Sequence, residues 1–336
     1  MCRRPCSGPC PVRPPERERG AALLTVLMLV AVVAVLAGTM LERLRLTTRL
    51  AGNAAAGEQA RAFAEAAETL ATTRVTALLG PSQDRVTLAG GWSGRPFALP
   101  LPGGGVAVAR VSDGGNCFNL NGLVTATGPG LYATNPVQRV QFARLLRLTG
   151  VGAQVAERVS AGAADWIDSD QDQQPSGAED GTYLGRVPAY RTAGTLMADP
   201  SELRAIDGVT AEVYAAVRPW LCTLPRAEPA AINVNTLTPE QAPLVAMLAP
   251  DTMSVAMARG LILRRPPLGF ASASEFWKQA SLQGVTADER QSAVTTRWFA
   301  LRIDVTNGPT RLQEQALIDA TRLPARLVAR QWGDPT

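Results

Sequence analysis

The spacing of apolar residues predicts one long N-terminal helix. Residues 21–41 are almost free of polar side chains, and at about 1.5 Å per residue they are long enough to cross a hydrocarbon core. Residues 41–79 contain no proline and are rich in Ala, Glu and Arg, and Gly80-Pro81 then stops the helix. We expect a helix that is hydrophobic in its first half and amphipathic in its second. The stripe predicted to pack on a sheet consists of Phe63, Ala66, Leu70 and Ala77.

The C-terminal residues show the period of two that indicates β-strands. From Phe299 to Val305 every second residue is a large hydrophobe, and Asn307-Gly308 then marks a turn. Residues 312–319 and 326–332 complete an antiparallel meander, and residues 106–111 form a further strand. The pattern predicts an α+β fold in which the long N-terminal helix packs on a small antiparallel sheet.

The stretch between these strands is mostly helical in character and contains an internal repeat. Residues 145–156, centred on Gly150, parallel residues 203–214, centred on Gly208, and residues 245–256 form a weaker third copy. Each copy predicts a helix, a tight turn and a second helix. We therefore expect a large α-helical lobe inserted between the strands of the sheet.

Composition excludes several classes of chemistry. The 336 residues are 46% hydrophobic, enough for more than one packed core, and they include no histidine. Histidine-based triads and histidine metal clusters are therefore absent. Lys278 is the only lysine and follows no glycine-rich loop, so a phosphate-binding P-loop is excluded. No acid and base are placed at opposing distances, and we expect a protein that is not an enzyme.

The N-terminal charges lie directly before the apolar run. The first twenty residues carry five arginines and two glutamates, a net charge of +3 out of +4, which leaves a nearly neutral body. Basic residues before a membrane span hold that end in the cytoplasm, so residues beyond about Glu42 are expected on the periplasmic side of the inner membrane. A plain signal anchor is the alternative reading of this segment.

The junction Arg19-Gly20-Ala21 resembles the type IV prepilin cleavage site, in which a charged leader ends in glycine directly before the apolar helix. The resemblance implies cleavage by prepilin peptidase between Gly20 and Ala21 and methylation of the new N-terminus, where most pilins carry phenylalanine. Thr25 becomes the fifth residue, a position at which most pilins have a glutamate that pairs with a neighbour's ammonium group in the filament core. A subunit with threonine there is suited to cap a filament rather than to lie within it.

Two cysteines follow the leader, Cys117 and Cys222. In an oxidising periplasm they form either one disulfide or two buried thiols, and we favour the disulfide.

Several motifs together resemble the K-type minor pseudopilin of the type II, or general, secretion pathway. The matching segments, in addition to the leader and helix, are Cys-Phe-Asn-Leu-Asn at 117–121, Asp-Trp-Ile-Asp-Ser-Asp at 165–170, Gly-Ala-Glu-Asp at 177–180, Ser-Glu-Leu-Arg at 201–204 and Ile-Asn-Val-Asn-Thr at 232–236. The resemblance implies a subunit at the pseudopilus tip with the I- and J-type minor pseudopilins. It also implies contact with the major pseudopilin and with the inner-membrane secretion assembly.

A calcium site is expected in the acidic loop after residue 167. Carboxylates gather there on a turn-rich segment, where they repel one another without a cation. Gln173 occupies the position at which an EF-hand loop needs glycine, so the site is not an EF-hand; a solvated loop is the alternative. The family resemblance implies calcium in the helical lobe. The candidate ligands are Asp168, Asp170, Asp172, Glu179 and Asp180.

A membrane-anchored periplasmic DNA-uptake protein is the rival hypothesis, because the Gly150 turn resembles a helix-hairpin-helix motif. The second copy has Thr210 where the paired glycine belongs, and the lobe lacks the basic surface that phosphate contacts need, so we do not expect nucleic acid as a partner. The predicted organisation is a cleaved leader at 1–20, a transmembrane helix at 21–41, a pilin-like domain at 42–115 and 296–336, and the inserted lobe at 116–295.

Overall fold

A computed structural model of the chain describes residues 16–80, 84–102, 104–250, 252–281, 284–285, 287 and 289–333, with side chains from Gly20 onward. Residues 1–15 of the predicted leader therefore lie outside the described residues. The chain divides into two units, residues 1–59 and 60–336. Helix α1, Glu16–Leu79, begins in the first unit and ends in the second, directly before Gly80 as predicted.

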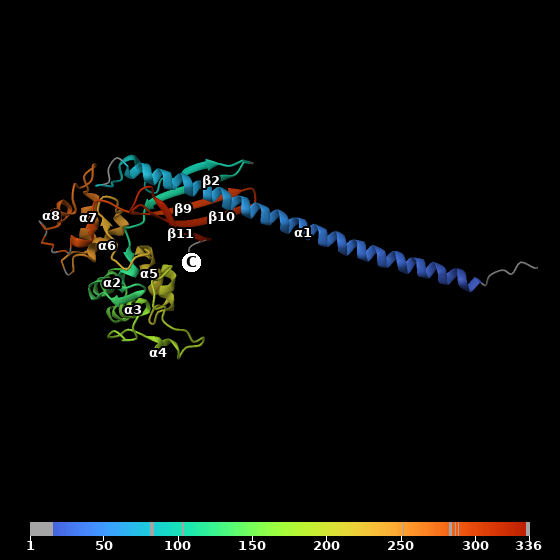
Figure 1. Cartoon of the computed structure of the whole chain (residues 1–336), viewed down its shortest axis with the longest axis horizontal. Coiled ribbons are helices and arrows are strands. Elements are labelled where there is room, and N and C mark those ends of the chain that lie inside the picture. The colour runs from blue at the N-terminus through green and yellow to red at the C-terminus, as the bar shows by residue number, and fades with distance from the viewer. Residues whose placement is uncertain are drawn as a thin grey trace, which may run out of the picture. The chain divides into compact units, whose positions relative to one another are not determined.

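The pilin-like domain contains a five-stranded antiparallel sheet (Figure 1), built from strands on both sides of the insertion in the order β1-β2-β9-β10-β11. The turn predicted at Asn307-Gly308 joins β9 to β10, and Gly308 takes the left-handed φ of 57° that such a turn requires. The lobe follows β2, which ends at Asp113, and precedes β9, which begins at Trp298, 185 positions later. Because β2 and β9 pair with each other, the lobe is an insertion between two neighbouring strands. The strands are β1 Phe97–Pro100, β2 Val106–Asp113, β9 Trp298–Asn307, β10 Thr310–Asp319 and β11 Arg326–Trp332.

The second half of α1 packs on this sheet through a stripe different from the predicted one. Ala66 and Ala77 are exposed, so the prediction was wrong for these two residues. The buried stripe lies beside the predicted one and consists mainly of alanine, and a helix that presents alanine can approach a sheet closely. Its members are Ala60, Ala64, Ala67, Ala71, Val75 and Leu79, which pack against β2, β9 and β10.

Two buried carboxyl groups and an arginine lie between α1 and the sheet. Nε and Nη2 of Arg330 on β11 donate to the two carboxylate oxygens of Glu68 on α1, each at 2.5 Å. Nε of Arg330 also lies 3.7 Å from Oε1 of Glu314 on β10. Glu314 is only 1% exposed, and neither of its carboxylate oxygens has a hydrogen-bond partner. Burial, and then the neighbouring Glu68, raise the pKa of Glu314 to about 8, so this carboxyl group is largely protonated at neutral pH.

The inserted lobe has its own hydrophobic core, in which Phe118 and Phe142 stack with ring centroids 4.9 Å apart. Besides the predicted helices it contains three two-stranded sheets, β3 with β6, β4 with β5, and β7 with β8. The helices are α2 Pro136–Leu148, α3 Ala153–Ile167, α4 Asp180–Tyr183, α5 Ala211–Val217, α6 Ala242–Ala246, α7 Val255–Leu263 and α8 Ala273–Ser281. The short strands are β3 Phe118–Asn119, β4 Val124–Gly128, β5 Leu131–Thr134, β6 Leu221–Cys222, β7 Ile232–Asn233 and β8 Ser292–Ala293. The 3₁₀ turns are η1 Ala89–Gly91, η2 Leu120–Leu123, η3 Pro200–Ala205, η4 Arg218–Trp220, η5 Pro239–Gln241 and η6 Glu289–Gln291.

The repeat has the predicted helix-turn-helix form in its first copy and, as α6 and α7, in its third, but not in its second. Helices α2 and α3 flank Gly150, whose φ is 98°, as predicted. In the second copy the segment before Gly208 is a 3₁₀ turn rather than an α-helix. Pro200 opens that turn and Asp199 caps it, so hydrogen bonds within the first turn replace a longer helix.

A polar junction joins the lobe to the sheet. Asp113, the last residue of β2, accepts hydrogen bonds from the hydroxyls of Thr236 at 2.5 Å and Thr296 at 2.8 Å. Asn116 receives the backbone N–H of Asn233 at 2.8 Å and donates to Thr236 at 2.9 Å. Burial raises the pKa of Asp113, and these donors oppose that effect. The junction thus binds the two ends of the insertion to each other.

Candidate functional site

The acidic loop begins where α3 ends and closes on itself. One carboxylate oxygen from each of Asp168, Asp170 and Glu179 lies within 4.8 Å of the other two. A Ca²⁺ ion binds oxygen at about 2.4 Å, so opposed ligands are about 4.8 Å apart. Three carboxylates at this separation fit a single ion, with further positions left for carbonyl oxygens or water.

The charges in this cluster are not compensated by the protein. Asp168 is 2% exposed and Glu179 is 6% exposed. Both carboxylate oxygens of Glu179, and Oδ1 of Asp168, are buried without a hydrogen-bond partner. Burial, and then the neighbouring carboxylates, raise the pKa of Glu179 to about 8; burial raises that of Asp168 to about 6. An unpaired buried anion is costly, and a bound cation would remove the cost.

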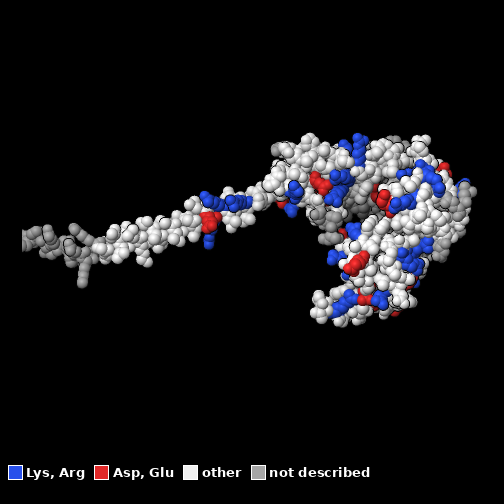
Figure 2. Space-filling view, turned by 180° about the vertical axis from the view of Figure 1, so that it is seen from behind, with Lys and Arg blue, Asp and Glu red and all other residues white. Residues whose placement is uncertain are grey.

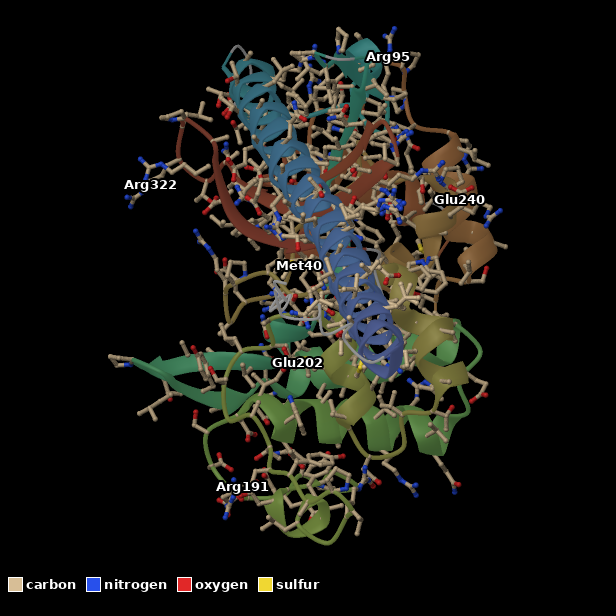
Figure 3. The ribbon with its side chains drawn as sticks, turned by 90° about the vertical axis from the view of Figure 1, so that its right-hand side faces the viewer. Met40, Arg95, Arg191, Glu202, Glu240 and Arg322 are labelled. Atoms are coloured by element: carbon tan, nitrogen blue, oxygen red, sulfur yellow. A yellow bond between two sulfur atoms is a disulfide. The ribbon has the colours of Figure 1, made fainter. Side chains whose placement is uncertain are left out.

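Asp172 and Asp180 lie outside this cluster. Asp172 is exposed, and its backbone N–H donates to Asp170 Oδ1 at 2.8 Å. Asp180 instead accepts from the Arg191 guanidinium at 2.5 Å and from the backbone N–H of Thr192 at 2.9 Å. The Thr192 backbone N–H and hydroxyl, together with Arg191, hold the pKa of Asp180 below its usual range. Figure 3 labels Arg191 on the outer loop of the lobe. Its ion pair with Asp180 holds this loop, which follows α4, against the start of that helix.

Two polar residues that support the cluster were missed as site residues. Asp165 is fully buried one helical turn before Asp168, and its Oδ2 accepts the backbone N–H of Ala178 at 2.8 Å. It thereby holds the far side of the loop, and a Cβ on Gly177 would lie 2.0 Å from the same oxygen. Thr134 at the end of β5 donates to Asp168 Oδ2 at 2.7 Å. The spacing of Asp165 and Asp168 was a usable signal, whereas the approach of Thr134 depends on tertiary structure.

The structure joins Cys117 to Cys222 in a disulfide whose Cα atoms are 5.8 Å apart. The bond lies beside the parallel pair of β3 and β6, in which Asn119 is the register partner of Cys222. It closes a sequence separation of 105 residues, which includes the whole acidic loop.

Asparagines in two of the family motifs act as clamps on the backbone. Asn121 is completely buried; its amide donates to the carbonyls of Met197 and Leu224, and its oxygen accepts the N–H of Met197 at 2.7 Å. Asn235 similarly binds both the carbonyl and the N–H of Phe270. Each asparagine therefore replaces the hydrogen bonds that a strand partner would supply to an irregular loop.

The predicted processing site lies on α1 in the N-terminal unit. Gly20 and Ala21 are exposed helical residues, and the Thr25 hydroxyl donates to the carbonyl of Ala22 at 2.9 Å. An 18-residue window of this helix reaches a mean hydropathy of 2.8, and none of that window is buried by the rest of the protein. A helix of this length and composition fits a single-pass membrane anchor.

Two family models, both described as "Type II secretion system (T2SS), protein K", match residues 116–226 and 232–297. The chain belongs to the type II secretion system protein K family. It is 30% identical to the protein K of Pectobacterium carotovorum over 95% of this chain and 97% of that protein. It is 33% identical to that of Klebsiella pneumoniae over the same shares. The predicted resemblance to the K-type minor pseudopilin is thereby confirmed.

A solved structure supports the same family and the fold. A chain in the crystal structure of the GspK-GspI-GspJ complex from the enterotoxigenic Escherichia coli type 2 secretion system superposes with a TM-score of 0.71 and 30% identity. The match covers 83% of this chain and 97% of that one. The predicted α+β fold is confirmed, and the chain is a minor pseudopilin of a structural family. The rival hypothesis of a DNA-uptake protein finds no support among these relatives.

Proposed function

We propose that this subunit sits at the tip of the pseudopilus with the I- and J-type minor pseudopilins, where it initiates or caps the filament that drives export of folded periplasmic proteins. The relative in the solved complex is crystallised with GspI and GspJ, which is the assembly we assign to this chain. The inserted lobe is the observation that carries the proposal. It adds a separately cored body beside the helix-and-sheet domain, and a filament interior has little room for it.

The sequence of the anchor supports the same position. In the filament core a buried ammonium group needs an anionic partner, and Thr25 offers only a hydroxyl that is already engaged with Ala22. A subunit without this carboxylate cannot pair with the subunit next to it in the usual way. A terminal position removes the need for such a pair at one side of the subunit.

The remaining assignments concern processing and topology. Prepilin peptidase would cut between Gly20 and Ala21, and the new N-terminus would be methylated. The helix would span the inner membrane, with the N-terminus of the protein in the cytoplasm and most of the chain in the periplasm. There it would meet the major pseudopilin and the inner-membrane secretion assembly. We assign the chain a structural role without catalytic chemistry, because the family is a structural one.

Calcium is the cation we propose for the loop cluster. Asp168, Asp170 and Glu179 offer only oxygen ligands, which hard cations prefer. The two carboxylate oxygens of Glu179 that lack a hydrogen-bond partner would coordinate the ion. Its role would be to hold the loop closed between α3 and α4. The ion would have no part in a reaction.

The tip assignment is tested by counting subunits. Filaments are assembled in cells, cross-linked and analysed by quantitative mass spectrometry against labelled peptide standards. We expect one copy of this subunit for each copy of the I- and J-type proteins, with a mature N-terminus at Ala21. Many copies distributed along the shaft would contradict the tip position, and an intact N-terminus at Met1 would contradict the processing.

A further inference from the structure

A basic segment of α1 follows the apolar run directly. Arg43, Arg45 and Arg49 are exposed, and they make no ion pair within the described residues. Glu42 is the only acidic residue between Ala21 and Gly57, so this part of the helix carries a net charge of +2. Figure 2 shows the Lys and Arg colour gathered on one stretch of α1, next to a long stretch without charge. We call the three arginines the arginine collar.

The collar lies at the depth of lipid headgroups if residues 21–41 fill the hydrocarbon core. Those 21 residues span about 31 Å as a helix, which matches the thickness of the core. Arg43 and Arg45 then follow within about 6 Å, and Arg49 lies about 12 Å beyond the edge. Helical side chains lean toward the N-terminus of their helix, so these guanidinium groups reach back toward the membrane.

The surrounding residues also suit a membrane interface. Leu44, Leu46 and Leu50 are 65%, 60% and 60% exposed, so exposed apolar side chains neighbour the arginines along this part of the helix. The first aromatic residue after Ala21 is Phe63, so the Trp and Tyr side chains that often anchor a helix at the interface are missing here. The arginines are therefore the polar anchors available at this edge.

We propose that the arginine collar binds the phosphate groups of anionic phospholipids in the leaflet where α1 leaves the membrane. The inference rests on the membrane anchor proposed above. Lipid is favoured over a second copy of this helix, because α1 has only Glu42 to offer in the same zone and two collars would repel each other. Bound headgroups fix the depth of the anchor and hold the subunit in the membrane until the filament takes it up.

The test uses the full chain in nanodiscs that contain equal amounts of phosphatidylglycerol and phosphatidylcholine. Native mass spectrometry then measures which lipids stay bound. One basic residue near an anionic surface corresponds to about a fivefold preference, so we expect phosphatidylglycerol to be retained at least about fivefold over phosphatidylcholine. The preference should be lost in the triple variant R43Q/R45Q/R49Q and should weaken as salt rises from about 50 to 500 mM.

The matched control is the triple variant R311Q/R322Q/R326Q, which removes the same charge from exposed arginines of the sheet domain. Figure 3 labels Arg322, which projects away from the sheet. This control should keep the lipid preference. Equal retention of both lipids by the native chain would overturn the collar, and so would a preference that survives in the collar variant. A chain that fails to enter nanodiscs at all would contradict the membrane anchor, and the collar with it.

Discussion

Removing the charge of Glu179 should change stability in opposite directions with and without calcium. The side chain has two buried carboxylate oxygens without a partner, next to Asp168 and Asp170. In chelator near pH 7, native Glu179 must take up a proton to be buried without a partner, because its pKa is raised to about 8. The variant E179Q avoids this cost, so we expect it to be more stable than the native chain by about 1–3 kcal/mol. In calcium, it loses a ligand, and the order should reverse.

The size of the calcium effect follows from mass action. An extracellular calcium site with a Kd of about 10⁻⁴ M gives about 2.7 kcal/mol at about 10 mM calcium, because the ligand is then at about 100 times its Kd. For a body the size of the lobe, each kcal/mol corresponds to about 2–4 °C in Tm. The native chain should therefore gain about 5–11 °C in calcium, and E179Q should gain much less.

The assay is thermal unfolding of the full chain in detergent, followed by tryptophan fluorescence in calcium and in chelator. D172N is the matched control, since Asp172 is exposed and outside the cluster; it should respond to calcium like the native chain. Magnesium at the same concentration should give a smaller shift, because that ion sheds water reluctantly. Unchanged Tm values on adding calcium, or a calcium response in E179Q as large as the native one, would refute the assigned site.

Three further predictions concern the rest of the fold. Replacing Cys117 and Cys222 by serine should lower the free energy of unfolding by about 2–5 kcal/mol, because the disulfide closes a separation of 105 residues. Denaturant unfolding measures this loss, and reductant should lower the stability of the native chain by the same amount. The pKa of Glu314 is raised from 4.5 to about 8, so its contribution to stability is complete below pH 4.5 and disappears as pH rises through about 8. E314Q should therefore become more stable relative to the native chain by about 2–4 kcal/mol between pH 5 and 9, and parallel pH profiles would show that this carboxyl does not titrate as described. Asn121→Ala should cost about 2–4 kcal/mol, since it leaves buried backbone groups of Met197 and Leu224 unpaired; an effect below about 0.5 kcal/mol in denaturant unfolding would mean that the clamp is dispensable.

Local patterns in the sequence were sufficient for the main elements of the helix-and-sheet domain. The period of two in residues 299–305, the turn at Asn307-Gly308 and the helix stop at Gly80 each act over a few residues, and each was found where predicted. The buried face of α1 was harder to predict, because its stripe is mostly alanine. A hydrophobicity pattern gives most weight to Phe63 and Leu70, whereas close approach to the sheet selects the smallest side chains.

The acidic loop divides in the same way between local and distant interactions. Its composition alone indicated a cation site, since five carboxylates on one turn-rich segment repel one another. Which carboxylates converge was decided by partners from other segments. Arg191 and Thr192 draw Asp180 away, while Thr134 from the β5 hairpin holds Asp168 in place.

The sequence by itself determined the membrane-length helix, the C-terminal meander, the position of the insertion and the family resemblance. These depend on periodicity, length and motifs, which are properties of consecutive residues. Only the tertiary structure decided which carboxylates of the loop converge, whether Cys117 and Cys222 form a disulfide, the burial of Glu314 and the asparagine clamps. Each of these features joins residues that are far apart in the chain, and its contribution to stability depends on burial. Neither the contact nor the burial exists before the chain has folded.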